Sequence, residues 1–202
     1  MSLQLPKLLN RIHGLYREFD RDILLFQMAT GIRCPDGCGI CCQSQFVEAT
    51  LLECLPLACE IFDQGKEEPT LSVIDERTER GDLKCVLYVP HQDLPEYGWC
   101  AFYDYRPLVC RLFGFAGRRN KFGQKELCLC REVKKAEPAK STAAETGTHL
   151  IHVPVFHDAF MRIASLSPGI GNPLLPINTA LKQSLEYLYW KRPRRRKMKR
   201  AA

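Results

Sequence analysis

The chain has 202 residues, of which 46% are hydrophobic and 26% charged, as in an ordinary globular domain. Its net charge of +6 arises at residues 191–202, which carry eight Lys and Arg and no acid. The remaining residues sum to about −2, which argues against a nucleic-acid surface on the folded body. No apolar run approaches the length of a membrane span, so we expect no transmembrane segment.

The first 22 residues are interrupted by charges and offer neither the apolar core nor the small-residue cleavage site of a signal peptide. We therefore expect a cytoplasmic, reducing location. In that setting the eleven cysteines are better explained as metal ligands or catalytic thiols than as disulfides.

Two helices are predicted in the first third of the chain. Apolar residues recur every three or four positions over 5–29, which indicates an amphipathic helix that Gly31 ends. A second helix is expected over 47–63, where Thr50 and Glu53 have the spacing of a capping box. Both helices precede or flank the first group of cysteines.

The middle of the chain predicts a β-hairpin. Residues 67–82 are polar and indicate a connection or edge structure. Residues 83–89 are rich in β-branched and aromatic side chains, and 98–105 are the expected partner strand across a long loop. A turn at Pro107 is expected to begin a short helix.

The last third predicts a linker and two helices. Residues 134–147 are rich in Ala, Lys and Ser and indicate a solvated linker or loop, and 155–166 and 177–190 indicate helices. The glycines of the intervening "SPGIGNP" fit a turn rather than a nucleotide-binding loop.

We therefore expect a small, mainly helical α+β domain with a short β-hairpin, whose loops are organised by cysteine-ligated metal. Its expected parts follow the order of the chain. They are an N-terminal helix packed on the domain (1–31), a cysteine-cluster region (32–133), a linker with C-terminal helices (134–190) and a basic disordered tail (191–202).

Four cysteines crowd into "CPDGCGICC", at positions 34, 38, 41 and 42. Thiolates bind soft or borderline metals, and glycine-rich turns let the backbone wrap closely around an ion or cluster. The adjacent pair Cys41 and Cys42 is difficult to place on one tetrahedral ion. It favours a multi-metal cluster, two centres, or one ligand beside a packing or reactive thiol.

The seven later cysteines divide by context. Those next to turns or strand ends are candidate ligands: Cys85, Cys100, Cys110, Cys128 and Cys130. Cys54 and Cys59 lie beside the apolar stripe of the second predicted helix. Because cysteine is among the most buried residue types, we expect these two to be packing residues.

The segments "CPDGCGICC", "KCVLY" and "CAFYDYRPLVCRLF" resemble the CxxCxxCC, or YkgJ-type, cysteine-cluster family. The resemblance covers residues 34–130 and implies zinc or iron chelation by about eight cysteines. The implied ligands are Cys34, Cys38, Cys41, Cys42, Cys85, Cys100, Cys110 and one of Cys128 and Cys130. Three residues, rather than two, separate the first two cysteines here. The family includes relatives resembling flagellin lysine N-methylases, so an enzymatic role stays open.

Eight thiols could hold two zinc ions or one to two iron–sulfur clusters. All-cysteine ligation, the adjacent pair and nearby aromatic residues favour an iron–sulfur cluster for redox or metal-dependent chemistry. The alternative is a zinc-stabilised binding module whose basic tail contacts nucleic acid or another anionic surface. A methyltransferase is less favoured, because the sequence has no recognisable methyl-donor site.

Two further groups allow more than one role. Arg106 could contact a bound anion, but a local ion pair with Asp104, beside a turn fixed by Pro107, is the simpler expectation. His149, His152 and His157 could complete a metal site, but histidines near helix starts more commonly cap or pack.

Overall fold

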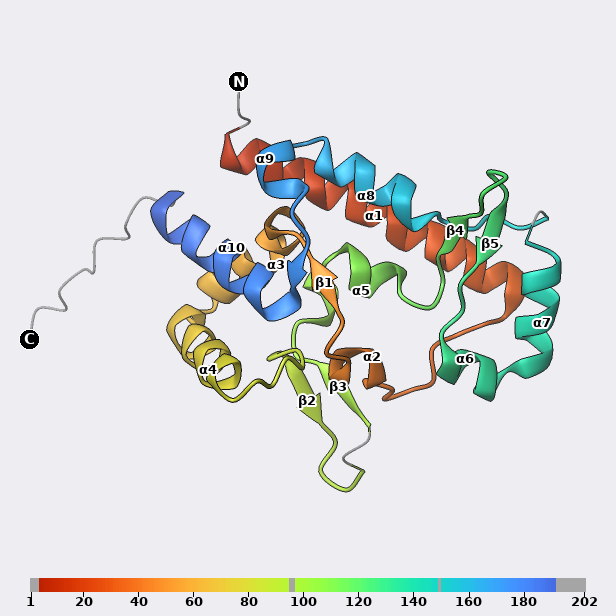
Figure 1. The fold of residues 1–202 in the computed structure, drawn as a ribbon, viewed down its shortest axis with the longest axis horizontal. Helices are drawn as coiled ribbons and strands as arrows, with labels where there is room; N and C mark the ends of the chain where they lie inside the picture. Colours follow the sequence, from red (N-terminus) through yellow and green to blue (C-terminus); the bar gives the residue numbers. More distant parts are fainter. Residues whose placement is uncertain (1–3, 95–96, 149, 192–202) are drawn as a thin grey trace, which may run out of the picture.

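The structure is a computed structural model that describes residues 4–94, 97–148 and 150–191 (Figure 1). It is mainly helical with small two-stranded antiparallel sheets, as the α+β prediction requires. In chain order the helices are α1 (Leu5–Thr30), α2 (Ile40–Gln43), α3 (Leu51–Asp63), α4 (Glu67–Glu79), the 3-10 turn η1 (Tyr103–Tyr105), α5 (Leu108–Leu112), α6 (Arg131–Ala136), α7 (Pro138–Thr146), α8 (Phe156–Ala164), α9 (Pro168–Gly171) and α10 (Ile177–Lys191). The strands are β1 (Glu48–Ala49), β2 (Tyr88–Pro90), β3 (Gly98–Cys100), β4 (Gly117–Arg119), β5 (Lys125–Leu127) and β6 (Leu175–Pro176).

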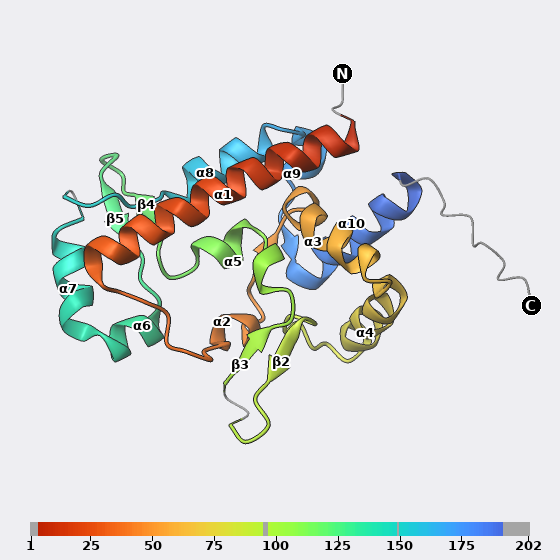
Figure 2. The ribbon, with the colours of Figure 1, turned by 180° about the vertical axis from the view of Figure 1, so that it is seen from behind.

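Helix α1 confirms the predicted N-terminal helix and forms one long side of the molecule, with α8 lying along it (Figures 1 and 2). Its buried side chains face the core at helical spacing: Leu8, Ile12, Tyr16, Phe19, Ile23 and Phe26. Gly31 ends the helix in the left-handed conformation at φ 67°, and its N–H donates to the Gln27 carbonyl at 2.9 Å. The chain then turns away toward the first cysteines.

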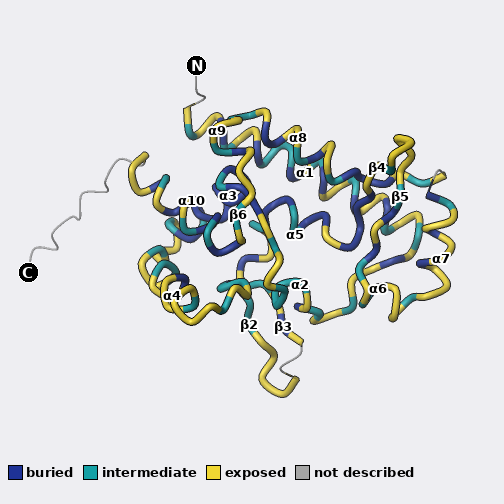
Figure 3. The backbone as a smooth tube through the Cα atoms, viewed as in Figure 1, coloured by how far each residue is buried: buried dark blue, intermediate teal, exposed yellow. Residues whose placement is uncertain are grey.

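Helix α3 lies between α1 and α10 and is buried on almost every side (Figure 3). Thr50 caps it through the predicted capping box, because its hydroxyl accepts from the Glu53 amide and Glu53 accepts from the Thr50 amide, both at 3.1 Å. The helix therefore begins at Leu51 rather than at 47, and the preceding residues form β1. Pro56 lies inside the helix.

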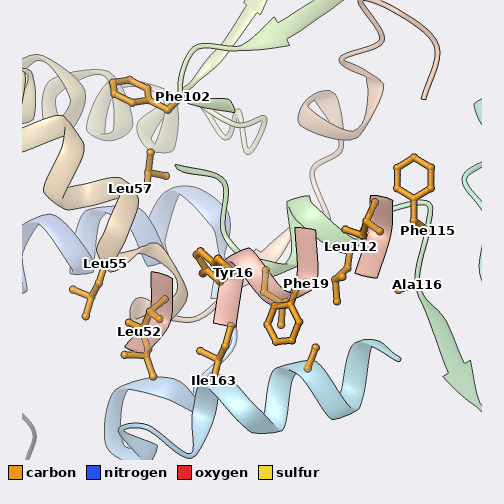
Figure 4. Close-up of a cluster of buried hydrophobic side chains, with 14 of the residues drawn as sticks. Tyr16, Phe19, Leu52, Leu55, Leu57, Phe102, Leu112, Phe115, Ala116 and Ile163 are labelled. Carbon is orange, nitrogen blue, oxygen red and sulfur yellow. The ribbon is translucent and has the colours of Figure 1, made fainter. Parts of the chain in front are cut away.

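The main hydrophobic core lies where α1, α3, α5 and α8 meet. Figure 4 shows Phe19 of α1, Leu52 of α3, Leu112 of α5 and Ile163 of α8 among the clustered side chains. Burying such apolar groups is the dominant favourable contribution to folding. Helix α10 packs against α3 on the other side, so the C-terminal helix is part of the same body.

The predicted hairpin exists but is shorter than expected. Strand β2 pairs antiparallel with β3, with Tyr88 opposite Cys100 and Pro90 opposite Gly98. Cys85 lies in the turn before β2, and after β3 the chain enters η1 instead of continuing as a strand. Two sheets were not predicted: β1 pairs with β6, and β4 pairs with β5.

Two segments expected to be irregular are helical. Residues 67–79 form α4, whose Ile74 is buried against the core. The expected linker at 134–147 lies largely within α6 and α7. Alanine has the highest helix propensity, and Pro138 occupies the first turn of α7, where proline is tolerated, so this composition supports a helix.

Helix α9 occupies part of the predicted turn at "SPGIGNP". The basic segment from residue 192 onward lies outside the described residues. Within the described part of the chain, no helix is both long enough and apolar enough to cross a membrane.

Candidate metal centre

Seven of the predicted metal ligands line one cavity of about 310 Å³. They come from four segments that are far apart in sequence: the loop after α1 with α2, the turn before β2, β3, and α5. Apolar side chains such as Leu57, Phe102 and Leu181 form much of the remaining wall. The cysteines that line the cavity are Cys34, Cys38, Cys41, Cys42, Cys85, Cys100 and Cys110.

The first two cysteines lie in a tight turn between α1 and α2. The Cys38 amide donates to the Pro35 carbonyl at 3.1 Å, and Gly37 adopts φ 68°, a left-handed conformation that favours glycine. The Gly37 carbonyl also accepts from the Gly98 amide at 2.9 Å, at the start of β3. This bond holds the cysteine turn against the hairpin that carries Cys100.

The ring of Tyr88 packs over the backbone of Gly39 and Gly98, where an added Cβ would overlap it. Its hydroxyl donates to the Tyr97 carbonyl and accepts from the Gln43 side-chain amide, each at 2.9 Å. The two glycines therefore allow an aromatic side chain to clamp α2 onto the β2–β3 hairpin. This contact fixes the direction in which α2 presents its pair of cysteines.

Cys85 and Cys110 are held by backbone contacts to other elements. The Cys85 amide donates to the Cys42 carbonyl at 3.0 Å, and Asn178 of α10 binds the backbone on either side of Cys85. Cys110 lies in α5, whose first turn faces the buried carboxyl group of Glu53. Both thiols are thus positioned by residues remote in sequence.

Cys128 and Cys130 do not line this cavity. They lie beside a second cavity of about 370 Å³, together with Phe113, which lines both. Cys128 is exposed, and its thiol lies 3.7 Å from the Glu126 carbonyl. Cys130 is half-buried, and its sulfur contributes to the raised pKa of Cys34. Of the two, Cys130 is therefore the one that faces the first group of thiols.

Burial and mutual repulsion raise the pKa values of most thiols around the cavity. Burial raises the pKa of Cys85 to about 11 and that of Cys110 well above its ordinary value, with nearby sulfurs adding to the effect. At the cavity wall, partial burial and Cys38 raise the pKa of Cys34 to about 12. Without a cation, these groups are protonated at neutral pH.

Cys41 and Cys42 behave differently because they are hydrogen-bonded to each other. The Cys42 thiol donates to the Cys41 sulfur, which lowers the pKa of Cys41 and raises that of Cys42. Arg106 lowers the pKa of Cys41 further through its positive charge. The pair therefore holds one thiolate more readily than Cys34, Cys85, Cys100 or Cys110 does.

In the described part of the chain, no three or more Cys, His, Asp or Glu side chains are grouped closely enough to hold a metal ion as they stand. The thiols therefore share a cavity, but they do not form a coordination shell. The structure brings seven of the nine candidate ligands to one place and leaves Cys128 and Cys130 beside it.

The predicted packing cysteines are buried, with exposed fractions of 0% for Cys54 and 8% for Cys59. The histidine segment lies elsewhere. His152 is 3.4 Å from a carboxylate oxygen of Asp22, His157 is exposed at the start of α8, and position 149 lies outside the described residues. Neither described histidine lines the cysteine cavity.

Arg106 lines the cysteine cavity and does not form the expected ion pair with Asp104. Its guanidinium lies over the ring of Tyr103 instead, and the Asp104 carbonyl accepts from the side chain of Arg111. The ion pair expected between Arg106 and Asp104 was therefore wrong, whereas Pro107 does begin the turn that carries Cys110, whose amide donates to the Pro107 carbonyl at 3.1 Å.

Sequence reasoning missed three residues that position the site: Tyr88, Asn178 and Glu53 in its contact with α5. The spacing of Thr50 and Glu53 did predict the capping box. No local signal marks Asn178, because its partners are more than 90 residues away along the chain. Comparison with protein-family models, with curated proteins and with solved structures gives no match.

Proposed function

We propose that this protein binds metal through the cysteines of the 310 Å³ cavity, and that the metal is iron in an iron–sulfur cluster. The cluster would serve redox or metal-dependent chemistry. The observation that carries the proposal is the convergence of seven thiols, from four distant segments, on one cavity. The resemblance to the cysteine-cluster family, drawn from the sequence, points to the same chemistry.

The donor set fits a soft or borderline metal. Thiolate sulfur is the preferred ligand of iron–sulfur clusters and zinc. Five of the seven thiols have raised pKa values, partly because ionising one thiol opposes ionising the next: Cys34, Cys42, Cys85, Cys100 and Cys110. A bound cation would reverse that relation and stabilise the thiolates together.

Cavity size and composition favour a cluster over a single zinc ion. One zinc ion takes four ligands in a closed tetrahedron and needs no cavity of about 310 Å³. The largely apolar wall would limit access of water, which is one of the factors that tune a cluster's potential. The seven cavity cysteines and Cys130 are the ligands that we propose, and the lowered pKa of Cys41 favours its thiolate form.

The test is metal and sulfide analysis of protein purified without oxygen. We expect stoichiometric iron and acid-labile sulfide, with broad visible absorption that disappears on oxidation. The Cys85→Ser and Cys110→Ser variants should lose the absorption. Cys54→Ala, which changes a buried thiol outside the cavity, should keep it. A colourless protein holding only zinc would refute the iron–sulfur assignment.

The alternative is a zinc-stabilised binding module. It is favoured by the small amount of regular structure around the cavity, where the sheet is three residues long on each strand and α2 has four residues. Bound zinc would then cross-link segments that fold poorly alone. This alternative predicts that chelators unfold the protein. It also predicts that removing residues 191–202 abolishes nucleic-acid binding without changing the zinc content.

A further inference from the structure

The cysteine cavity also contains a fixed cation. The guanidinium of Arg106 lies over the ring of Tyr103, with its central carbon 3.4 Å from the ring centroid. Its Nε donates to the Tyr103 backbone carbonyl at 2.7 Å. Stacking and the hydrogen bond together restrict the side chain to one orientation, so less conformational entropy is lost when it binds a partner.

The backbone of Arg106 is anchored as firmly as its side chain. Arg111 donates from Nε to the Arg106 carbonyl at 2.7 Å, and its Nη1 is 2.5 Å from a carboxylate oxygen of Asp20. Arg111 is itself only 7% exposed and stacks on the ring of Tyr16. Arg106 is therefore tied to α1 through a buried arginine, and its guanidinium is held in place before any ligand arrives.

The outer edge of the Arg106 guanidinium has no partner among the residues that the structure describes. Within the described part of the chain, no carboxylate forms an ion pair with Arg106, and neither Nη1 nor Nη2 donates a hydrogen bond. The positive charge of Arg106 favours the thiolate forms of Cys41 and Cys100, so these two sulfurs lie near it. Two parallel N–H donors in this fork match the two oxygens of a carboxylate.

Large aromatic side chains line the same cavity as Arg106. Trp99 and Phe113 line the cavity and are 51% and 48% exposed. Exposed aromatic side chains around a concave site indicate a ligand whose body is apolar. The cavity thus offers a point of positive charge and an apolar wall within one enclosure.

We propose that the cysteine cavity binds a small organic carboxylate with an apolar body, its carboxylate on Arg106 and its body against Trp99 and Phe113. The inference rests on the proposed function in one respect, which is that the ligand lies beside the metal. The ligand's class is set by Arg106 and the aromatic wall, whichever metal the thiols hold.

Calorimetry on the full-length protein, purified without oxygen, tests the proposal with three probes. We expect 3-phenylpropionate to bind, and its neutral amide to bind roughly ten- to a hundredfold more weakly, because the amide cannot make the charge-assisted pair. Acetate, which has the carboxylate without the apolar body, should also bind weakly. Equal affinity for the acid and the amide, or no binding of the acid, would overturn the proposal.

Variants locate the binding. Arg106→Gln and Arg106→Lys should each weaken 3-phenylpropionate about tenfold or more, since lysine keeps the charge but not the fork. Trp99→Leu should weaken it as well. The controls are Arg80→Gln, just after α4, and Trp190→Leu at the end of α10, both exposed and outside the cavity; they should leave affinity unchanged. Unchanged affinity in both Arg106 variants would contradict the assignment.

Metal and sulfide content is measured on the same samples, so that the two proposals can fail separately. Full metal content without acid binding contradicts the carboxylate site alone. Acid binding that depends on Arg106 in a protein without metal contradicts the metal proposal alone. If Arg106→Gln loses its metal, that variant no longer tests the carboxylate site. The Arg106→Lys variant, and the comparison of acid with amide on the unaltered protein, then decide whether Arg106 binds the carboxylate.

Discussion

Asn178 fixes the backbone on both sides of Cys85. Its side-chain oxygen accepts from the Val86 amide at 3.0 Å, and its side-chain nitrogen donates to the Lys84 carbonyl at 2.8 Å. Asn178 is 5% exposed and lies near the start of α10. One buried amide thus connects the C-terminal helix to the segment that presents a cavity thiol.

Replacing Asn178 with alanine should therefore affect both stability and metal binding. The change leaves two part-buried backbone groups without their side-chain partners, which costs about 1 to 3 kcal/mol. Urea unfolding measures that loss, and metal analysis should show reduced occupancy because Cys85 is no longer held. The control is Asn172→Ala at an exposed position. Full metal occupancy in Asn178→Ala would contradict a positioning role.

Cys128 and Cys130 allow a matched comparison between two neighbouring thiols. Only Cys130 is close enough to influence the pKa of Cys34, whereas Cys128 is exposed beside the Glu126 carbonyl. Under the proposed function, Cys130→Ser should reduce metal content markedly, and Cys128→Ser should leave it nearly unchanged. Metal analysis of the two variants, prepared in parallel without oxygen, measures the difference. Equal loss in both would show that the chain uses both thiols.

The parts of the fold that sequence predicted are those fixed by local patterns. The apolar stripe of α1 and the Thr50–Glu53 capping box depend on residues within a few turns of each other, and both are confirmed. Helices α6 and α7 were missed because polar composition suggested a linker, while alanine propensity and contacts such as the Lys134–Glu145 ion pair favour a helix.

The candidate site was likewise predictable from the sequence only in part. Residue spacing marked the cysteines as candidates, and it separated Cys54 and Cys59 as packing residues. The residues that hold the thiols in place could not be recognised, because Tyr88 and Asn178 are ordinary residues until the fold sets them against Gly39 and Cys85. Whether metal occupies the cavity stays a prediction from sequence.

Two arginines stack on aromatic rings of α1 and should differ strongly in importance. Arg111 lies over Tyr16, is nearly buried, and donates to Asp20 and to two backbone carbonyls. Arg111→Met should destabilise the protein by about 3 kcal/mol, because Asp20 and two part-buried carbonyls lose the donor that the nearly buried arginine supplies. Arg162→Met, which removes a half-exposed arginine from over Phe19, should cost much less. Thermal or urea unfolding compares the two, and similar losses would contradict this ranking.

Because of Glu53, the unfolding free energy of the protein should fall as pH rises. Burial raises the pKa of Glu53 from its ordinary value of 4.5 to about 6, although the Thr50, Val109 and Leu108 amides partly offset the effect. Its Oε2 is buried without a hydrogen bond of ordinary geometry. Below pH 4.5 the carboxyl group is neutral in both the folded and the unfolded chain, so ionisation costs nothing there.

As pH rises from 4.5 to above 6, the unfolded chain releases this proton first, and the folded state must ionise a buried group. Relative to Glu53→Gln, the native protein should therefore lose about 2 kcal/mol of unfolding free energy across that window. Urea unfolding of both proteins at pH 4.5 and pH 7.5 measures the change.

Glu18→Gln is the control, and its pH dependence should have the opposite sign. Hydrogen bonding to Arg162 lowers the pKa of this exposed carboxyl, so its stabilising contribution is lost as pH falls. A difference between the native protein and Glu53→Gln that does not vary with pH would refute a raised pKa for Glu53.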